Sequence, residues 1–248
     1  MRTYPMTIAI ASYLLCALAN TVATDPLAAF EHDSFDTGDG KLTVYFLGHA
    51  SLMMTWGGTV IYVDPVSEHA AFKKLPKADL VLVTHEHYDH LDVKAIAAVE
   101  QEGTRVLLNT AGSKLLGRGE ALKNGDSATV CGIAIRALPA YNTTSGRDKF
   151  HPNNGRDNGY MLSRGGKRLY IAGDTEDIPE MRGLGSIDIA FLPMNQPYTM
   201  TPAQVARAAG MLHPRVLYPY HYGDTDVDEL AALLKDAAGT ELRIRKLK

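Results

Sequence analysis

The chain has 248 residues, a hydrophobic fraction of 46%, a charged fraction of 21% and a formal net charge of −3. This length and composition are typical of a globular protein with one large domain and argue against a disordered or fibrous chain. Acidic and basic residues are mixed along the sequence, so we expect no general nucleic-acid-binding surface.

The N-terminal segment has the pattern of a secretory signal peptide. Arg2 precedes an apolar stretch over residues 6–19, and small-residue cleavage motifs end at Ala19 and Ala23. The apolar run is short and interrupted for a membrane span. We therefore expect residues 1–23 to be a signal peptide and the mature chain to be periplasmic or secreted, without a membrane span. An N-terminal membrane anchor and a soluble N-terminal helix are the alternatives.

The cysteines give little information about the compartment. Cys16 and Cys131 are the only two in the chain, and Cys16 would be removed with the signal peptide. The mature chain would then have no internal disulfide. We expect Cys131 to pack as a small buried residue.

Apolar runs and turn residues predict the elements of a single domain over residues 24–248. In the first half we expect strands at 41–47, 51–56, 59–63, 80–83 and 105–108, and helices at 92–100 and 110–116. In the second half we expect strands at 128–130, 133–138, 159–163, 167–172, 187–192, 216–220 and 242–244, helices at 201–212 and 225–238, and a long irregular loop at 139–157. Strands come first in each half and helices later, which favours two mixed β-sheets packed face to face with helices outside.

A cluster of potential metal ligands directly follows the predicted strand at 80–83. The run Thr84-His85-Glu86-His87-Tyr88-Asp89-His90 places three imidazoles and a carboxylate within six positions, although the chain has only nine histidines. His85 and His87 can face the same way from an extended backbone, while Asp89 and His90 can turn toward a neighbouring ion. Imidazole and carboxylate together suit zinc, manganese or iron. The spacing indicates two metal ions, and a polar surface loop is the alternative.

Two further candidate ligands also follow predicted strands. Asp174 lies in Gly173-Asp174-Thr175, directly after the strand at 167–172, and His221 directly follows the strand at 216–220. A carboxylate between two ions can bridge them, and a late histidine can complete the ligands of the second ion. Three strand ends therefore contribute metal-binding side chains.

These motifs resemble those of the metallo-β-lactamase superfamily. The set H-x-H-x-D-H, G-D-T and a late strand-end histidine carries the resemblance, with Leu47-Gly48-His49-Ala50-Ser51 and Val63-Asp64-Pro65 in support. It covers about residues 41–225. It implies an αββα four-layer sandwich of two mixed β-sheets flanked by helices, with a dinuclear site at one edge. Aspartate stands in G-D-T where β-lactamases carry cysteine. The chain is therefore similar to the compact metal-dependent hydrolases, which include ascorbate-6-phosphate lactonase and the N-acyl-phosphatidylethanolamine phospholipase D group.

The resemblance also implies a ligand set. His85 and His87 would hold the first ion, Asp89 and His90 the second, with Asp174 bridging them and His221 completing the second site. The family's next histidine usually follows the strand that here ends at residue 140, where this chain has Tyr141 and Asn142. We therefore expect His151 to reach back from the long loop as the third ligand of the first ion. Asn142 or a water molecule is the alternative.

Other residues are expected to support the site. We expect His49 and Asp64 to hold the ligating imidazoles in position, with ordinary strand-end packing as the alternative. We also expect some residues to contact a small-molecule substrate. An anionic substrate would suit the arginines among them, because guanidinium binds phosphate and carboxylate. These residues are Tyr141, Asn142, Arg147, Arg156 and Tyr222. An exposed loop without a binding role is equally compatible with the sequence. His32 and His69 are expected to be solvated.

The expected chemistry follows from the ions. Two divalent ions, expected to be Zn²⁺ with Mn²⁺ or Fe²⁺ as alternatives, would share a hydroxide because metal binding lowers the pKa of water toward about 7. We expect Asp89 and Asp174 to be the catalytic carboxylates. The sequence thus predicts an exported dinuclear metal-dependent hydrolase of an ester, lactone or phosphodiester bond. A non-enzymatic or degenerate metal-binding protein of the same fold and a β-lactamase-like amide hydrolase are the alternatives.

Overall fold

Two seven-stranded mixed β-sheets form the centre of the molecule. The structure, a computed structural model, describes Met1 and residues 25–247. The predicted signal peptide, beyond Met1, therefore lies outside the described residues. Within the described part of the chain, no helix is both long and apolar enough to cross a bilayer.

The first sheet contains the strands of the first half of the chain, in sequence order across the sheet. These are β1 (His32–Thr37), β2 (Gly40–Gly48), β3 (Ser51–Trp56), β4 (Thr59–Val63), β5 (Leu80–Leu82), β6 (Arg105–Leu108) and β7 (Glu120–Ala121). Strands β1 to β4 pair antiparallel, and β4 to β7 pair parallel. The parallel strands end at one edge, which therefore collects the residues that follow them.

The second sheet repeats this arrangement. Its strands are β8 (Ser127–Val130), β9 (Ile133–Ala140), β10 (Asp157–Arg164), β11 (Lys167–Ile171), β12 (Ile189–Pro193), β13 (Val216–Tyr220) and β14 (Glu241–Leu242), again in sequence order across the sheet. Strands β8 to β11 pair antiparallel, and β11 to β14 pair parallel.

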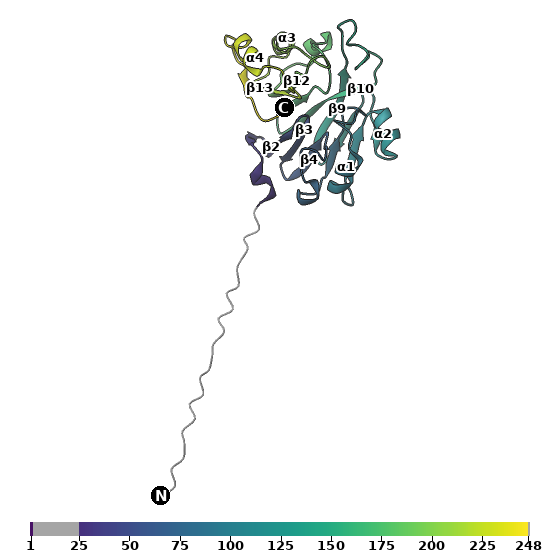
Figure 1. Cartoon of the computed structure of the whole chain (residues 1–248), viewed down its shortest axis with the longest axis vertical. Helices are drawn as coiled ribbons and strands as arrows, with labels where there is room; N and C mark the ends of the chain where they lie inside the picture. The colour runs from purple at the N-terminus through teal and green to yellow at the C-terminus, as the bar shows by residue number, and fades with distance from the viewer. Residues whose placement is uncertain (2–24, 248) are drawn as a thin grey trace.

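Three apolar cores separate four layers. The central core joins the facing sides of the two sheets and includes Leu52 and Ile135. The helices are α1 (Val93–Val99), α2 (Thr110–Leu116), α3 (Pro202–Leu212) and α4 (Val227–Leu233), and the short 3₁₀ helices are Pro26–Ala29, Phe72–Lys74 and Pro179–Gly183. Helix α1 packs on the outer side of the first sheet through Ile96, and α3 packs on the second through Val205. Figure 1 shows α3 and α4 beside β12 and β13, away from α1 and α2. The predicted αββα sandwich is confirmed.

Local sequence explains most element ends. Asp92 caps α1 by accepting from the backbone of Lys94 and Ala95, and Thr201 and Gln204 form a capping box at α3. Several expectations differ from the structure. No strand was predicted where β1 and β7 lie, α4 ends at Leu233 rather than near residue 238, and Cys131 is exposed. Cys131 is exposed because it forms a tight turn between β8 and β9 with a left-handed φ of 49°.

Candidate metal centre

The candidate ligands meet at the edge where strands of both sheets end. His49 follows β2 and the histidine cluster follows β5, whereas Asp174 follows β11 and His221 follows β13. The backbone N–H of His221 donates to the carbonyl of His49 at 3.1 Å, which joins the two sheets at this edge. Residues from both halves of the chain therefore form one site.

One group of ligands consists of three histidines. Nitrogen atoms of His85, His87 and His151 all lie within 4.8 Å of one another. The Nε2 atom of His85 lies 3.0 Å from Nδ1 of His87, and the ring centroids of His87 and His151 are 5.0 Å apart. The long loop thus brings His151 beside His85 and His87, as expected. The amide nitrogen of Asn142 donates to the carbonyls of Arg147 and Tyr198, and its Oδ1 atom is buried without a hydrogen-bond partner among the described residues.

A second group contains Asp89, His90, His221 and, in addition, His49. The Oδ2 atom of Asp89 lies 3.4 Å from Nε2 of His221 and 3.3 Å from Nε2 of His49. The His49 and His221 rings contact each other with centroids 3.8 Å apart and an interplanar angle of 40°. His49 was expected only to position the ligands, but its ring nitrogen lies among the ligand atoms themselves.

Asp174 lies between the two groups. Its Oδ2 atom is 3.4 Å from Nε2 of His151 and 3.4 Å from Nε2 of His221, while its Oδ1 atom is 3.5 Å from Nε2 of His90. His85 is also near, with Nε2 at 4.0 Å from Oδ2. This is the arrangement expected of a carboxylate that bridges two ions.

The donor atoms fit metal ions. Buried atoms without a hydrogen-bond partner among the described residues include Nε2 of His90, Oδ1 of Asp174 and both ring nitrogens of His221. Buried polar atoms are normally satisfied, because an unmet hydrogen bond costs about 1–3 kcal/mol. Unpaired imidazole and carboxylate atoms that converge on one place therefore indicate bound cations, and this ligand chemistry suits zinc, manganese or iron.

The electrostatics of the site also favour cations. Burial lowers the pKa of His85, and the neighbouring His90 lowers it further, so His85 is held in the neutral form that binds metal. Burial alone would raise the pKa of Asp174, but the nearby His221 and His90 outweigh it and hold this pKa well below its usual range. Asp174 is therefore held in the ionised form that binds a cation.

Asp64 fixes the orientation of the His90 ring. Its Oδ2 atom accepts a hydrogen bond from Nδ1 of His90 at 2.8 Å, and its carboxylate also accepts from the backbone and hydroxyl of Thr84 at 2.8 Å each. The Nε2 atom of His90 is thereby directed toward Asp174. Asp64 is fully buried. Its φ of 43° lies in the left-handed region, as do the φ angles of His49 (52°) and His221 (47°). Such strained backbone gathers at functional sites.

Asp157 does the same for His151, and the sequence analysis did not identify it. Its Oδ2 atom lies 3.0 Å from Nδ1 of His151, and the guanidinium of Arg156 donates to both of its oxygens. Arg156 also lies 3.5 Å from Glu86. The sequence signal was weak, because Asp157 stands at the end of a polar loop among other charged residues.

Glu176 anchors the loop that carries His151. Its Oε2 atom accepts from the backbone N–H groups of Thr143 and Thr144 at 2.8 and 2.7 Å and from the Thr143 hydroxyl at 2.9 Å. Its Oε1 atom pairs with Arg147 at 3.0 Å. The side chain of Glu176 is fully buried, so these contacts hold a long surface loop against the body of the protein.

The site opens into a cavity of about 730 Å³, whose wall includes His49, His87, Asp89, His151, Asp174 and His221. None of the five residues expected to meet substrate lines it. Tyr141 donates to Glu180, and Tyr222 donates to the carbonyl of Arg245. Asn142 donates to the carbonyl of Tyr198, while Arg147 and Arg156 pair with Glu176 and Asp157. His69 was expected to be solvated, but it is half-buried in the cavity wall and stacks on His49 with a centroid distance of 5.7 Å.

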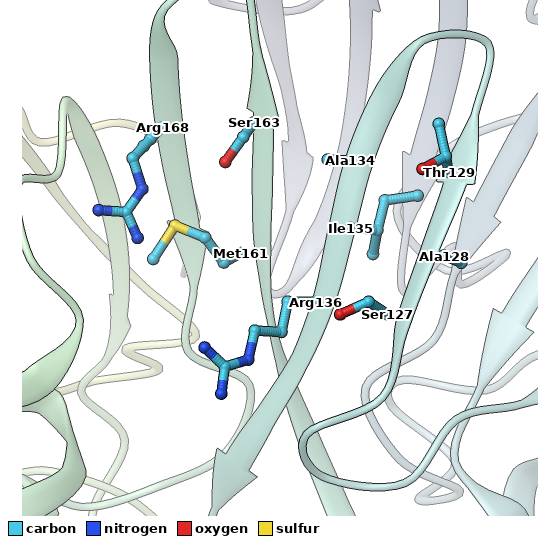
Figure 2. A pocket seen from close by; sticks show the side chains of 9 residues that line it. All are labelled: Ser127, Ala128, Thr129, Ala134, Ile135, Arg136, Met161, Ser163 and Arg168. Carbon is cyan, nitrogen blue, oxygen red and sulfur yellow. The ribbon is translucent and has the colours of Figure 1, made fainter.

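A second concavity lies on β8 to β11. Figure 2 shows Arg136 and Arg168 on either side of Met161, with Ser127 and Ser163 nearby. Its volume is about 330 Å³, and its lining contains neither a histidine nor a carboxylate. It lacks the side chains for metal-dependent chemistry, so the larger cavity is the candidate site.

Comparison with known proteins identifies the family. A family model described as a beta-lactamase superfamily domain matches residues 43–221. The chain belongs to the metallo-β-lactamase superfamily. Its relatives within the superfamily include a UPF0173 metal-dependent hydrolase from Anaeromyxobacter dehalogenans, 32% identical over 83% of this chain and 84% of the relative. Another, from Thermococcus kodakarensis, is 33% identical over 79% of this chain and 93% of the relative.

Solved structures with a similar fold support this assignment. A protein from Parabacteroides distasonis, named as a candidate metal-dependent hydrolase, has a TM-score of 0.86 and 57% identity, and the match covers 88% of this chain and all of that one (100%). Igni18, a metallo hydrolase from Ignicoccus hospitalis, has a TM-score of 0.69 at 24% identity, covering 83% of this chain and 95% of that one. The second likeness is one of fold.

Proposed function

We propose that this protein is an exported dinuclear metal-dependent hydrolase that cleaves an ester, lactone or phosphodiester bond. The observation that carries the proposal is the position of Asp174, which has imidazoles of both ligand groups within 4.0 Å of its oxygens. Its superfamily relatives are named metal-dependent hydrolases, which supports hydrolysis as the reaction class. Export rests on the N-terminal sequence pattern alone.

The residues that would hold the ions follow from the two groups. His85, His87 and His151 would hold the first; Asp89, His90 and His221, joined by His49, the second; and Asp174 would bridge them. Divalent ions at these positions, zinc in our proposal, would supply a water of lowered pKa as nucleophile and would polarise the oxygen of the bond to be cleaved.

The two carboxylates have different surroundings and therefore different roles. The Asp174 side chain is 3% exposed and lies beneath the imidazoles, so it acts as a fixed negative charge. The Asp89 side chain is 27% exposed and lines the cavity, where it can accept a hydrogen bond from an attacking water and orient it. Burial opposes ionisation of Asp89, but the nearby imidazoles of His221 and His49 outweigh it and keep its pKa far below the usual range.

Metal analysis and turnover test this function together. Purified mature protein should contain two equivalents of divalent metal and hydrolyse a p-nitrophenyl ester, a lactone or bis-p-nitrophenyl phosphate. Chelation should abolish turnover and re-addition of metal should restore it. Asp89→Ala should lower kcat by about 10²-fold or more in protein that retains both ions. One inert equivalent of metal, with no turnover of any of the three substrates, would instead favour a non-enzymatic metal-binding protein.

A further inference from the structure

Among the described residues, the cavity wall contains carboxylates but no lysine or arginine. Its acidic members are Glu68, Glu86, Asp89 and Asp174. Two divalent ions would bring four positive charges. Glu68, Asp89, Asp174 and the ionised water of the proposed function would balance them, while Glu86 is paired with Arg156 at 3.5 Å. No excess positive charge then remains to attract an anionic group that does not itself bind an ion.

Within the described part of the chain, the arginines near the cavity are paired with other groups. The Arg147 guanidinium contacts Glu176, Gln196 and Gln204, and that of Arg156 contacts both oxygens of Asp157 and the Phe150 carbonyl. Lys149 places its ammonium 5.0 Å from the centre of the Phe150 ring but does not line the cavity. A phosphate or carboxylate group on the substrate would therefore meet no free basic side chain in the wall.

Aromatic rings supply the apolar part of the wall. Phe150 and Tyr198 pack edge to face with centroids 4.9 Å apart, and both line the cavity, as does Tyr88. Tyr88 is 87% exposed and Tyr198 is 44% exposed. Exposed aromatic rings in a concave site offer apolar area and stacking surfaces to a ligand.

We propose that the cavity selects an uncharged substrate, an ester or lactone with an aromatic or long apolar group, and discriminates against esters that carry a separate anionic group. This inference rests on the proposed function and narrows it. The apolar group lies against Tyr88, Phe150 and Tyr198, while Glu68 repels a negative charge at the cavity mouth. The volume of about 730 Å³ suits a ligand of drug-like size.

A matched pair of esters tests the selectivity. p-Nitrophenyl hexanoate and mono-p-nitrophenyl adipate have acyl chains of equal carbon number and differ by a terminal carboxylate. We expect kcat/KM to be about tenfold or more higher for the neutral ester. Calorimetry with the corresponding anilides, hexananilide and adipic acid monoanilide, should show the same order of affinity without turnover. Equal or reversed preference would overturn the inference but leave the proposed function intact. No turnover of any substrate by metal-loaded protein would refute the proposed function instead.

Substitutions at Glu68 and Tyr88, each with a control variant, test which residues produce the preference for the neutral ester. Glu68→Lys should reduce the preference for the neutral ester by about tenfold, whereas Glu102→Lys makes the same charge change at an exposed position before β6 and should not. Tyr88→Ala should raise KM for the neutral ester by about tenfold with metal content unchanged, and Tyr88→Phe, which keeps the ring, should retain the wild-type KM. Equal preference ratios in Glu68→Lys and Glu102→Lys would remove Glu68 from the inference. An unchanged KM in Tyr88→Ala would likewise remove the aromatic contact.

Discussion

The Nδ1 atom of His151 lies 3.0 Å from a carboxylate oxygen of Asp157, and its Nε2 atom lies 3.4 Å from Asp174. Because Nδ1–H donates to Asp157, the lone pair of Nε2 is free to bind a cation. The only histidine of the long loop is thereby directed into the site by a residue six positions later in the sequence.

Asp157→Asn should therefore weaken metal binding at the three-histidine group. The substitution keeps the shape of the side chain but removes the charge that orients His151, and loss of such a partner costs about 10–100-fold in metal affinity. Competition with a chromophoric chelator measures this. Asp236→Asn, at an exposed position, is the control. Identical dissociation constants in both variants would mean that the loop alone holds His151.

His49→Ala should weaken the second ion selectively. Its Nε2 atom lies 3.3 Å from Asp89 and its ring packs against that of His221, so its removal loosens the second group while the three-histidine group keeps its contacts. We expect about tenfold weaker binding of one of two equivalents. His32→Ala removes an exposed imidazole from β1 and should leave both equivalents unchanged. Unaltered binding of both ions in His49→Ala would mean that His49 contributes no more than packing.

Glu176→Ala should release the loop that carries His151. The substitution removes the acceptor for Thr143 and Thr144 and the partner of Arg147. Local opening should then become more frequent, and trypsin should cleave after Arg147 and Lys149 about tenfold faster than in the wild type. Glu229→Ala on α4, where Glu229 is exposed, is the matched control. Equal digestion rates would contradict the anchoring role.

Asp33 should make stability depend on acid pH. Burial favours its neutral form, but hydrogen bonds from Arg245 and Tyr218 outweigh burial and lower its pKa. A carboxyl whose pKa is lower in the native state stabilises the fold above its unfolded pKa of about 3.9, and that contribution disappears as pH falls through the native pKa. Asp33→Asn should therefore cost about 1–2 kcal/mol at neutral pH and progressively less below about pH 4. Urea unfolding across this range measures both. A constant difference at every pH would exclude ionisation as the cause.

The positions of the ligands could be predicted because they follow apolar strands. Runs such as Leu80–Leu82 and Val216–Tyr220 are buried and easily recognised, and the residue after each is fixed at the sheet edge. Placing His151 in the site needed the resemblance as well, because the loop itself has no periodic pattern.

The supporting contacts could not be predicted, because they join residues whose proximity depends on the completed fold. Glu176 meets Thr143 across 33 positions of sequence, and Arg147 meets Gln196 across 49. Arg147 and Arg156 were expected to contact the substrate because their pairing with the buried carboxylates of Glu176 and Asp157 could not be seen in the sequence. Strand β1 escaped recognition because its residues alternate between exposed and partly exposed positions and none is buried.

Because both sheets end at the same edge, metal binding there would also affect how the two sheets are held together. The first half of the chain, through β7, supplies His85, His87 and His90, and the second half, from β8 onward, supplies His151, Asp174 and His221. Ions bound there would cross-link the two sheets, in addition to the central core and the His221–His49 hydrogen bond. The free energy of metal binding would therefore also stabilise the packing of the two halves against each other. Each half expressed alone would contain only part of the binding site.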